Sequence, residues 1–223
     1  MPNSAIDFTA ARTLMVDGQV RPNKVTDPRV LAAMRSLPRE RFVPVDRTAL
    51  AYCDEDVPLG NGRFLVEPMV IARLVQIAAV QDGDRALVVG SGSGYGAALL
   101  AACGATVIAL EQDGALIALA RAVLPGVAGG VSLVEGPLAE GWKQGGPYGV
   151  ILIEGAVPEI PPAVLDQLRG DGGRLVTVIK RGARVGQAVL CSRAGGGRVD
   201  PHPVFDCAIP VLPMLKPAPG FVF

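Results

Sequence analysis

The sequence predicts an α/β protein built on a doubly wound, mostly parallel sheet, with N-terminal helices and an antiparallel hairpin at one sheet edge. The first observation is that apolar strand-like runs alternate with helical runs from about residue 84, the order that builds a parallel sheet. The second is that the first of these strands, RALVVG, leads directly into glycines at positions 90, 92 and 94. A glycine-rich turn after the first strand is typical of the ligand-binding edge of such sheets.

The N-terminal third of the chain predicts helices separated by loops. One helix is expected over residues 8–19. A second is expected over TDPRVLAAMRSLP, where Thr26 or Asp27 caps the helix and Pro28 occupies its first turn. A charged stretch rich in loop signals separates this helix from a third one, which is expected after Pro68.

The remaining two thirds predict the sheet and the helices that cover it. Strands are expected at RALVVG, TVIALE, VSLVEG, VILIEG and RLVTVI, and helices at residues 94–103, residues 114–124 and PAVLDQL. Strands near 186–191 and 204–212 have no helix between them, which predicts the antiparallel edge hairpin. The C-terminal KPAPGFVF is expected to pack as irregular chain.

Length and charge limit the classes of function. We predict a single domain over 1–223, with the N-terminal helices and a loop in 1–80 and the α/β core in 81–223. Lys plus Arg equals Asp plus Glu, at 21 each, so nothing favours binding to nucleic acid or to an anionic membrane. No apolar stretch reaches the roughly 20 residues of a membrane span, and the N-terminus lacks the order of a secretory signal. We expect a cytoplasmic protein, and the sequence leaves its oligomeric state open.

The cysteines and the single histidine argue against metal and nucleophilic chemistry. Cys53, Cys103, Cys191 and Cys207 are widely spaced, so we expect buried thiols and neither a metal site nor a disulfide framework. His202 lies between two prolines, where a loop residue is expected rather than the base of a hydrolase.

The glycine turn indicates what kind of ligand the sheet binds. A dinucleotide fingerprint needs a third small residue at the position that Tyr95 occupies, and no Lys-Ser/Thr follows to make a phosphate-binding loop. Glu111 ends the second strand, 21 residues after Gly90, the usual offset for a carboxylate that binds a ribose diol. A nucleoside without a pyrophosphate fits this pair, and S-adenosylmethionine is one such ligand. Structural glycines in another α/β protein are the alternative, and the prediction requires an open turn with Glu111 directed towards it.

Several segments in order resemble the protein-L-isoaspartate O-methyltransferase family. The resemblance covers roughly residues 12–180, and it rests on MVDGQVRPNKVTDPRVLAAMRSLPRERFVP, AYCDEDVPLG, VVGSGSGY, PYG and GGRLV. It implies a Rossmann-like methyltransferase sheet and the methylation, from S-adenosylmethionine, of the free carboxylate of isoaspartyl residues in damaged proteins. A carboxylate is already a nucleophile at neutral pH, so positioning and desolvation suffice without a histidine.

The chain departs from the family pattern at three places. The family segment Gly-Gln-Thr-Ile-Ser-x-Pro corresponds to GRFLVEP at 62–68, where Phe64 and Val66 replace the hydroxyl residues that help to hold the substrate. The family's Gly-Asp-Gly, whose Asp lies near the adenine, corresponds to Gly136 followed by Pro137 and a leucine. The Asp of Pro-Tyr-Asp corresponds to Gly149. A methyltransferase acting on another acceptor, or an inactive binding protein, are therefore alternative functions.

The resemblance, together with the turn, defines a candidate site. The loop 58–67 is expected to cover the substrate, with Asp54, Arg63 and Val66, at the position of the family serine, as candidate catalytic residues. Arg63 either grips a substrate carboxylate or is an ordinary solvated charge. Asp54 and Asp56 either orient the substrate backbone or the sulfonium of the cofactor, or cap local turns. Glu67 is expected at a helix start. The candidate cofactor-binding residues are Gly90, Ser91, Gly92, Ser93, Gly94, Tyr95, Glu111, Gln112 and Gly136.

Overall fold

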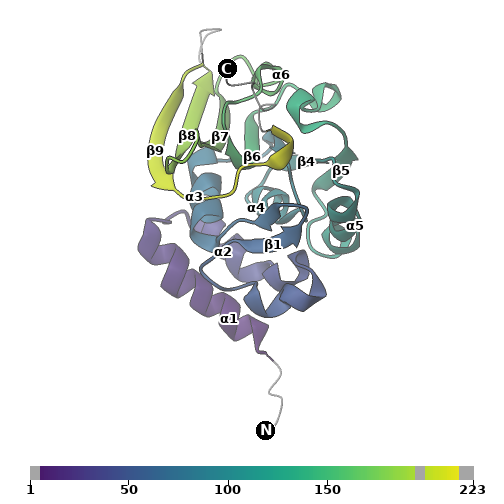
Figure 1. Cartoon of the computed structure of the whole chain (residues 1–223), viewed down its shortest axis with the longest axis vertical. Helices are drawn as coiled ribbons and strands as arrows, with labels where there is room; N and C mark the ends of the chain where they lie inside the picture. Colours follow the sequence, from purple (N-terminus) through teal and green to yellow (C-terminus); the bar gives the residue numbers. More distant parts are fainter. Residues whose placement is uncertain (1–5, 194–198, 216–223) are drawn as a thin grey trace, which may run out of the picture.

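The computed structural model describes residues 6–193 and 199–215 (Figure 1). Within these residues, the chain forms a seven-stranded sheet with the order β5-β4-β3-β6-β7-β8-β9. The first five strands of this order are parallel, and β8 and β9 are antiparallel to their neighbours. The bounds are β3 Arg85–Val89, β4 Thr106–Glu111, β5 Val131–Glu135, β6 Val150–Val157, β7 Gly173–Ile179, β8 Gly186–Arg193 and β9 Pro201–Cys207. This confirms the predicted fold class.

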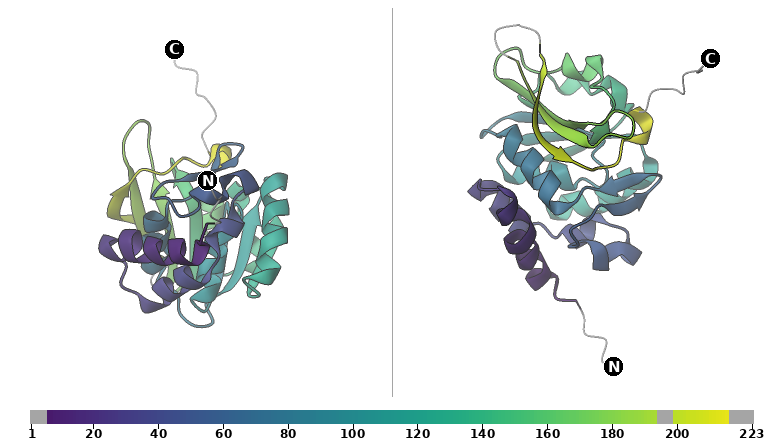
Figure 2. Two further views of the ribbon diagram at one scale, coloured as in Figure 1. Left: turned by 90° about the horizontal axis from the view of Figure 1, so that it is seen from below. Right: turned by 60° about the vertical axis from the view of Figure 1, so that its left-hand side comes forward.

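Helices of the N-terminal half and of the βα units cover one face of the sheet. They are α2 Pro28–Ser36, α3 Pro68–Ala78, α4 Tyr95–Ala102 and α5 Gly114–Val123, and they share one apolar core with the inward residues of the strands. The helix α1 Phe8–Met15 continues as a π-helical turn over Val16–Val20 and lies at the periphery of the molecule (Figure 2). The other face packs on shorter segments around Leu138, Tyr148 and α6 Pro162–Leu165. Because both faces are covered, every residue of β6 is buried.

Local sequence signals account for the helix starts. Asp27 caps α2, with its side chain accepting a hydrogen bond from Arg29 N at 2.8 Å, and Pro28 follows in the first turn, as predicted. Asp113 caps α5 in the same way through Ala115 N at 2.9 Å. The predicted helix over PAVLDQL is wrong in length, because only Pro162–Leu165 is α-helical and the chain then bridges back to Tyr148.

The end of the chain differs from its prediction. A strand is expected over 204–212, whereas β9 ends at Cys207 and the chain leaves the sheet edge. Residues 208–215, here called the strap, run from β9 across the front of the molecule to a short helical turn beside β4 and β6 (Figure 1). The strap is held to β6 by Ala156 N donating to Pro210 O at 3.0 Å and Leu212 N donating to Ala156 O at 2.9 Å. The KPAPGFVF segment lies outside the described residues.

The stretch expected to be a loop contains a small hairpin. Strands β1 Val57–Gly60 and β2 Arg63–Leu65 pair only with each other and do not join the main sheet. Residues 57–65 are here called the hairpin. Its tip, Gly60-Asn61-Gly62, adopts positive φ at all three positions, which glycine and asparagine tolerate best.

The cysteines agree with their prediction at three positions of four. Cys103, Cys191 and Cys207 are buried free thiols, and burial raises the pKa of each to about 11. Cys53 is exposed, contrary to the prediction, because it lies in the turn that follows residue 50. In the described part of the chain, no helix has both the length and the apolar character needed to cross a membrane.

Candidate cofactor and substrate site

The glycine turn lies at the point where the strand order reverses. Strand β3 pairs with β4 on one side and β6 on the other, and the turn at 90–94 joins its carboxyl end to α4. Gly90, Gly92 and Gly94 have φ values of 70°, 57° and 95°, which side chains would disfavour. The position and the conformation of the turn are those that a ligand at the carboxyl ends of the strands requires.

Glu111 lies beside this turn, at the end of β4, and is fully buried. Its Oε2 accepts a hydrogen bond from Gly92 N at 2.8 Å. Its Oε1 accepts from Gln112 N at 2.8 Å and from Asp113 N at 3.1 Å. The predicted juxtaposition of the acid and the glycine turn is therefore present.

Arg63 occupies the space between Glu111 and the turn. Its Nη1 donates to Glu111 Oε1 at 2.9 Å, and its Nη2 donates to Gly90 O at 2.8 Å. Its side chain is 3% exposed, so this ion pair is buried. The turn is therefore not open and the carboxylate of Glu111 is not free in this arrangement, contrary to the expectation. The alternative that Arg63 is an ordinary solvated charge is not met either, because its side chain is buried.

Three leucines complete the closure. Building a Cβ on Gly90 places it 3.2 Å from Leu212 of the strap and 3.4 Å from Leu138, and a Cβ on Gly92 would lie 3.4 Å from Leu59 of the hairpin. The cavity left beside Arg63 and Leu212 has a volume of about 10 Å³. That volume is enough for about one water molecule. The closing side chains come from the hairpin, the strap and the segment after β5.

A second acid, Glu154, lies under the same cover. It is 6% exposed, and its carboxyl packs so closely on Gly96 that a Cβ there would lie 2.3 Å from Oε2. Burial raises the pKa of Glu154 to about 8, although Arg63 and Arg39 favour its charged form. Sequence reasoning missed this residue, and the only signal was an acid at the end of the apolar run VILIEG.

Arg39 anchors the base of the hairpin from inside the core. It is fully buried, with Nε donating to Ala51 O at 2.6 Å and Nη2 donating to Val66 O at 2.8 Å. Its guanidinium lies 4.9 Å from the ring centroid of Tyr95. Burial lowers the pKa of Arg39. These bonds fix the chain on both sides of the hairpin while leaving its tip free of main-sheet pairing.

The candidate catalytic residues are not brought together as a substrate cradle. Asp54 is exposed, Arg63 is turned inward, and Val66 is buried with an apolar side chain. Asp56 Oδ1 accepts from Glu67 N at 2.9 Å, a bond between positions 11 residues apart that ties the two ends of the hairpin segment together, so it is not the cap of a local turn. Glu67 precedes the first turn of α3, as expected, and burial raises its pKa with help from the neighbouring acids.

The remaining candidate cofactor residues surround the turn. The Oγ atoms of Ser91 and Ser93 are buried without a hydrogen-bond partner. The Gln112 side chain accepts from the backbone N–H of residue 138 at 3.0 Å, and Gly136 N donates to Glu111 O at 3.0 Å. Tyr95 is fully buried, with its ring edge-on to a phenylalanine at 5.2 Å.

The departure at Gly149 has a structural reason. A Cβ at this position would lie 2.5 Å from Asp84 Oδ1. Asp84 is buried and pairs with Arg174, and its Oδ2 accepts from Gln81 N at 2.9 Å. An aspartate at position 149 would clash with Asp84 and place two carboxylates side by side. The buried Asp84 therefore requires a residue without a side chain at position 149.

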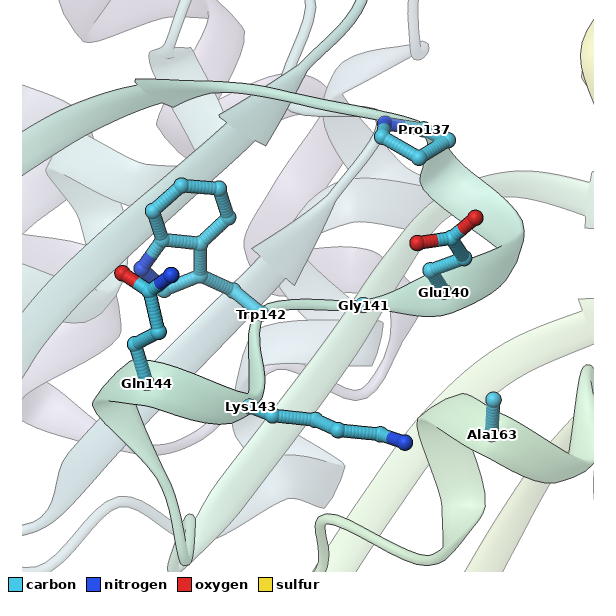
Figure 3. Close-up of a pocket in the computed structure, with 7 residues that line it drawn as sticks. All are labelled: Pro137, Glu140, Gly141, Trp142, Lys143, Gln144 and Ala163. Carbon is cyan, nitrogen blue, oxygen red and sulfur yellow. The ribbon is translucent and has the colours of Figure 1, made fainter.

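A hollow of about 310 Å³ is lined by none of the turn residues, but it includes Pro137, which stands where the family pattern has the Asp near the adenine. It opens between the segment after β5 and α6, and Glu140, Trp142 and Lys143 are among its lining residues (Figure 3). None of the predicted site residues lines this hollow.

The comparisons with known proteins agree with this architecture. A glycine turn and a facing acid at the switch point of such a sheet are typical of α/β folds that bind nucleotides or nucleosides. Its overall structure is similar to a solved protein-L-isoaspartate O-methyltransferase, with a TM-score of 0.76 and 21% identity over 90% of this chain and 65% of that one. It is also similar to a putative enzyme of the same name from Plasmodium falciparum in complex with S-adenosyl-L-homocysteine, with a TM-score of 0.74 and 18% identity over 95% and 99%.

Sequence similarity then gives the family. The profile of Protein-L-isoaspartate(D-aspartate) O-methyltransferase matches residues 12–208. The Protein-L-isoaspartate O-methyltransferase of Koribacter versatilis (strain Ellin345) is 37% identical over 201 residues, which are 90% of this chain and 89% of the relative. The chain belongs to the protein-L-isoaspartate(D-aspartate) O-methyltransferase family. The predicted reaction class and the S-adenosylmethionine cofactor are confirmed at the level of that family.

Arg63 occupies part of the candidate site for that cofactor in this structure. The turn and Glu111 are suited to an adenosyl group, and the unpaired serine hydroxyls offer further polar contacts. However, Arg63 holds the carboxylate of Glu111 and the Gly90 carbonyl in this structure. A ligand hydroxyl directed at Glu111 Oε1 would therefore compete with Arg63 for that oxygen.

Proposed function

We propose that this chain is an S-adenosylmethionine-dependent methyltransferase that methylates the free carboxylate of isoaspartyl residues in damaged proteins or peptides. The observation that carries the proposal is family membership over 12–208, which includes the glycine turn and Glu111 at the switch point. Gly90, Ser91, Gly92, Ser93, Gly94, Tyr95, Glu111, Gln112 and Gly136 are the proposed cofactor residues. We further propose that 1–223 works as one methyltransferase unit in the cytoplasm.

Asp54 and Arg63 remain proposed substrate residues only for an open form. When the hairpin tip moves outward, Arg63 carries a guanidinium that suits a carboxylate in a two-pronged geometry. Val66 contributes no hydrogen bond to a substrate, so it shapes the site only through its apolar side chain.

The test is methyl transfer from labelled S-adenosylmethionine to an isoaspartyl peptide, with its normal-aspartyl twin as the matched control. Labelling of the isoaspartyl peptide alone is the expected result. No labelling of either peptide by folded protein, at any cofactor concentration up to the millimolar range, would contradict the proposal.

A second candidate function is a methyltransferase fold that acts on another acceptor or only binds a partner. The observation that favours it is the buried Arg63–Glu111 pair together with the apolar Val66 at the position of the family serine. Cofactor binding without transfer to the isoaspartyl peptide would support this alternative.

A further inference from the structure

Arg63 contacts two parts of the proposed cofactor site at once. One guanidinium nitrogen bonds the carboxylate of Glu111, and another bonds the carbonyl of Gly90. A ribose diol donates hydrogen bonds to an acid at this place, so it competes with Arg63 for Glu111. The two cannot use Glu111 Oε1 at the same time, because Gln112 N and Asp113 N already share that oxygen with Arg63.

The hairpin that carries Arg63 is separate from the main sheet, so movement of its tip would leave that sheet intact. Its strands pair with each other and have no ladder to the main sheet, so opening breaks side-chain contacts and not a strand register. The tip Gly60-Asn61-Gly62 has positive φ throughout. The base is held by buried Val57 and Leu65 and by the Arg39 bonds.

A second contact holds the tip closed. Asn61 Nδ2 donates to Asp113 Oδ2 at 2.8 Å, which ties the tip to the start of α5. A Cβ on Gly62 would lie 3.2 Å from Pro213 of the strap. The tip therefore meets both the α5 cap and the strap when Arg63 is on Glu111.

We propose that Arg63 is an internal latch that competes with S-adenosylmethionine for Glu111, so that the cofactor binds only to molecules in which the hairpin tip has released this side chain. This inference rests on the proposed function for the identity of the ligand. If the released form makes up between about one tenth and one hundredth of the molecules, the apparent Kd is weakened about tenfold to a hundredfold.

The test measures S-adenosylhomocysteine binding by titration calorimetry to the full chain and two variants. Arg63→Gln keeps most of the side-chain length and removes the charge, while Glu111 retains its three backbone donors. The matched control is Arg184→Gln, on the exposed loop between β7 and β8. We expect Arg63→Gln to bind at least tenfold more tightly than the parent chain, and Arg184→Gln to bind like the parent.

Equal affinities of the parent and Arg63→Gln would overturn the latch, as would the absence of binding by both at millimolar ligand. If Arg63→Gln does not fold, Asn61→Gly decides the question, because it removes the bond to Asp113, tolerates the positive φ at this position and keeps the partner of Glu111. We expect Asn61→Gly to bind severalfold more tightly than the parent, and an unchanged affinity contradicts the latch.

The failure of the latch is distinguishable from the failure of the proposed function. Tighter binding by Arg63→Gln, with no methylation of the isoaspartyl peptide by the parent chain, supports the latch and counts against the repair activity. Methylation by the parent chain with no gain in affinity for Arg63→Gln supports the activity and overturns the latch.

Discussion

At the scale of single residues, the buried pair of Arg63 and Glu111 dominates the candidate site. Each charge is almost completely removed from water, at 3% and 0% exposure. Removing one partner of a buried pair leaves the other charge without compensation, which costs far more than the loss of a surface pair. Removing Arg63 alone is therefore expected to be costly, and while the pair is formed Arg63 occupies the carboxylate that the proposed ligand would use.

We expect Arg63→Ala to lower the free energy of unfolding by about 3 kcal/mol, measured by urea denaturation, because Glu111 stays buried without its cation. The matched control is Arg47→Ala, which breaks the exposed pair with Asp46. That loss is expected to stay below about 1 kcal/mol. Similar small losses for both variants would show that the Arg63–Glu111 pair does not stabilise the fold.

Glu154 gives the second residue-scale prediction, a dependence of stability on pH. Its pKa in the folded chain is about 8, above the value of about 4.3 for an unperturbed glutamate. At pH values between these two pKa values, Glu154 is protonated in the folded chain and ionised in the unfolded chain. The stability that Glu154 contributes is therefore fully present below its unfolded pKa and is lost as the pH rises through its folded pKa.

We expect the free energy of unfolding to fall with rising pH over this range more steeply in the parent chain than in Glu154→Gln. The difference in slope is up to about 1.4 kcal/mol per pH unit. Urea denaturation at several pH values between 5 and 8.5 measures it. Parallel profiles for the two proteins would mean that Glu154 titrates like an exposed glutamate.

At the scale of elements, the candidate site is covered by two segments far apart in the sequence, the hairpin near the N-terminus and the strap near the C-terminus. Leu212 of the strap is 4% exposed and packs against Gly90 and Gly155, where a Cβ on Gly155 would lie 2.6 Å from it. Backbone bonds to Ala156 hold this part of the strap on β6. The strap is therefore an integral part of the fold over the turn.

We expect Leu212→Ala to cost about 2–4 kcal/mol of unfolding free energy, because it leaves a cavity over the glycine turn. Val185→Ala is the control, since Val185 is 63% exposed on the β7–β8 loop and its truncation should change stability by less than about 0.5 kcal/mol. Thermal and urea denaturation measure both. A loss below 1 kcal/mol for Leu212→Ala would indicate that the strap packs loosely over the turn.

These elements also separate what the sequence predicts from what it does not. Periodicity and capping signals predict the parallel strands, α2 and the turn at 90–94, because each depends on residues near one another in the chain. The closeness of the turn to Glu111 follows from the strand-helix-strand order, which places the carboxyl ends of neighbouring parallel strands side by side. The Arg63–Glu111 pair joins positions 48 residues apart, and no local pattern specifies it. Apolar residues predict a strand over 204–212, which includes residues 208–212 of the strap, whereas the contacts of Leu212 with Gly90 and Gly155 are tertiary and have no local signal.

At the scale of the whole molecule, two of the departures from the family pattern gather at the closed site. Arg63 and Val66 lie in the segment that replaces Gly-Gln-Thr-Ile-Ser, and Leu138 lies in the one that replaces Gly-Asp-Gly. Arg63 and Leu138 contact the turn at Gly90, whereas the departure at Gly149 is explained by Asp84. At these two places, residues that the family resemblance assigns to substrate or cofactor are replaced by Arg63 and Leu138, which contact the protein's own turn at Gly90.

This replacement predicts how the molecule responds to ligand when it is heated. A ligand that binds only the folded state stabilises it by RT ln(1 + [L]/Kd), so a tenfold tighter Kd adds about 1.4 kcal/mol when ligand is in excess of both constants. For a chain of 223 residues, that difference corresponds to roughly 3–6 °C in Tm. We therefore expect S-adenosylhomocysteine to raise the Tm of Arg63→Gln by that much more than it raises the Tm of the parent. Scanning calorimetry with and without ligand measures both shifts, and Arg184→Gln serves as the control. Equal shifts in all three proteins would mean that cofactor binding does not require the release of Arg63.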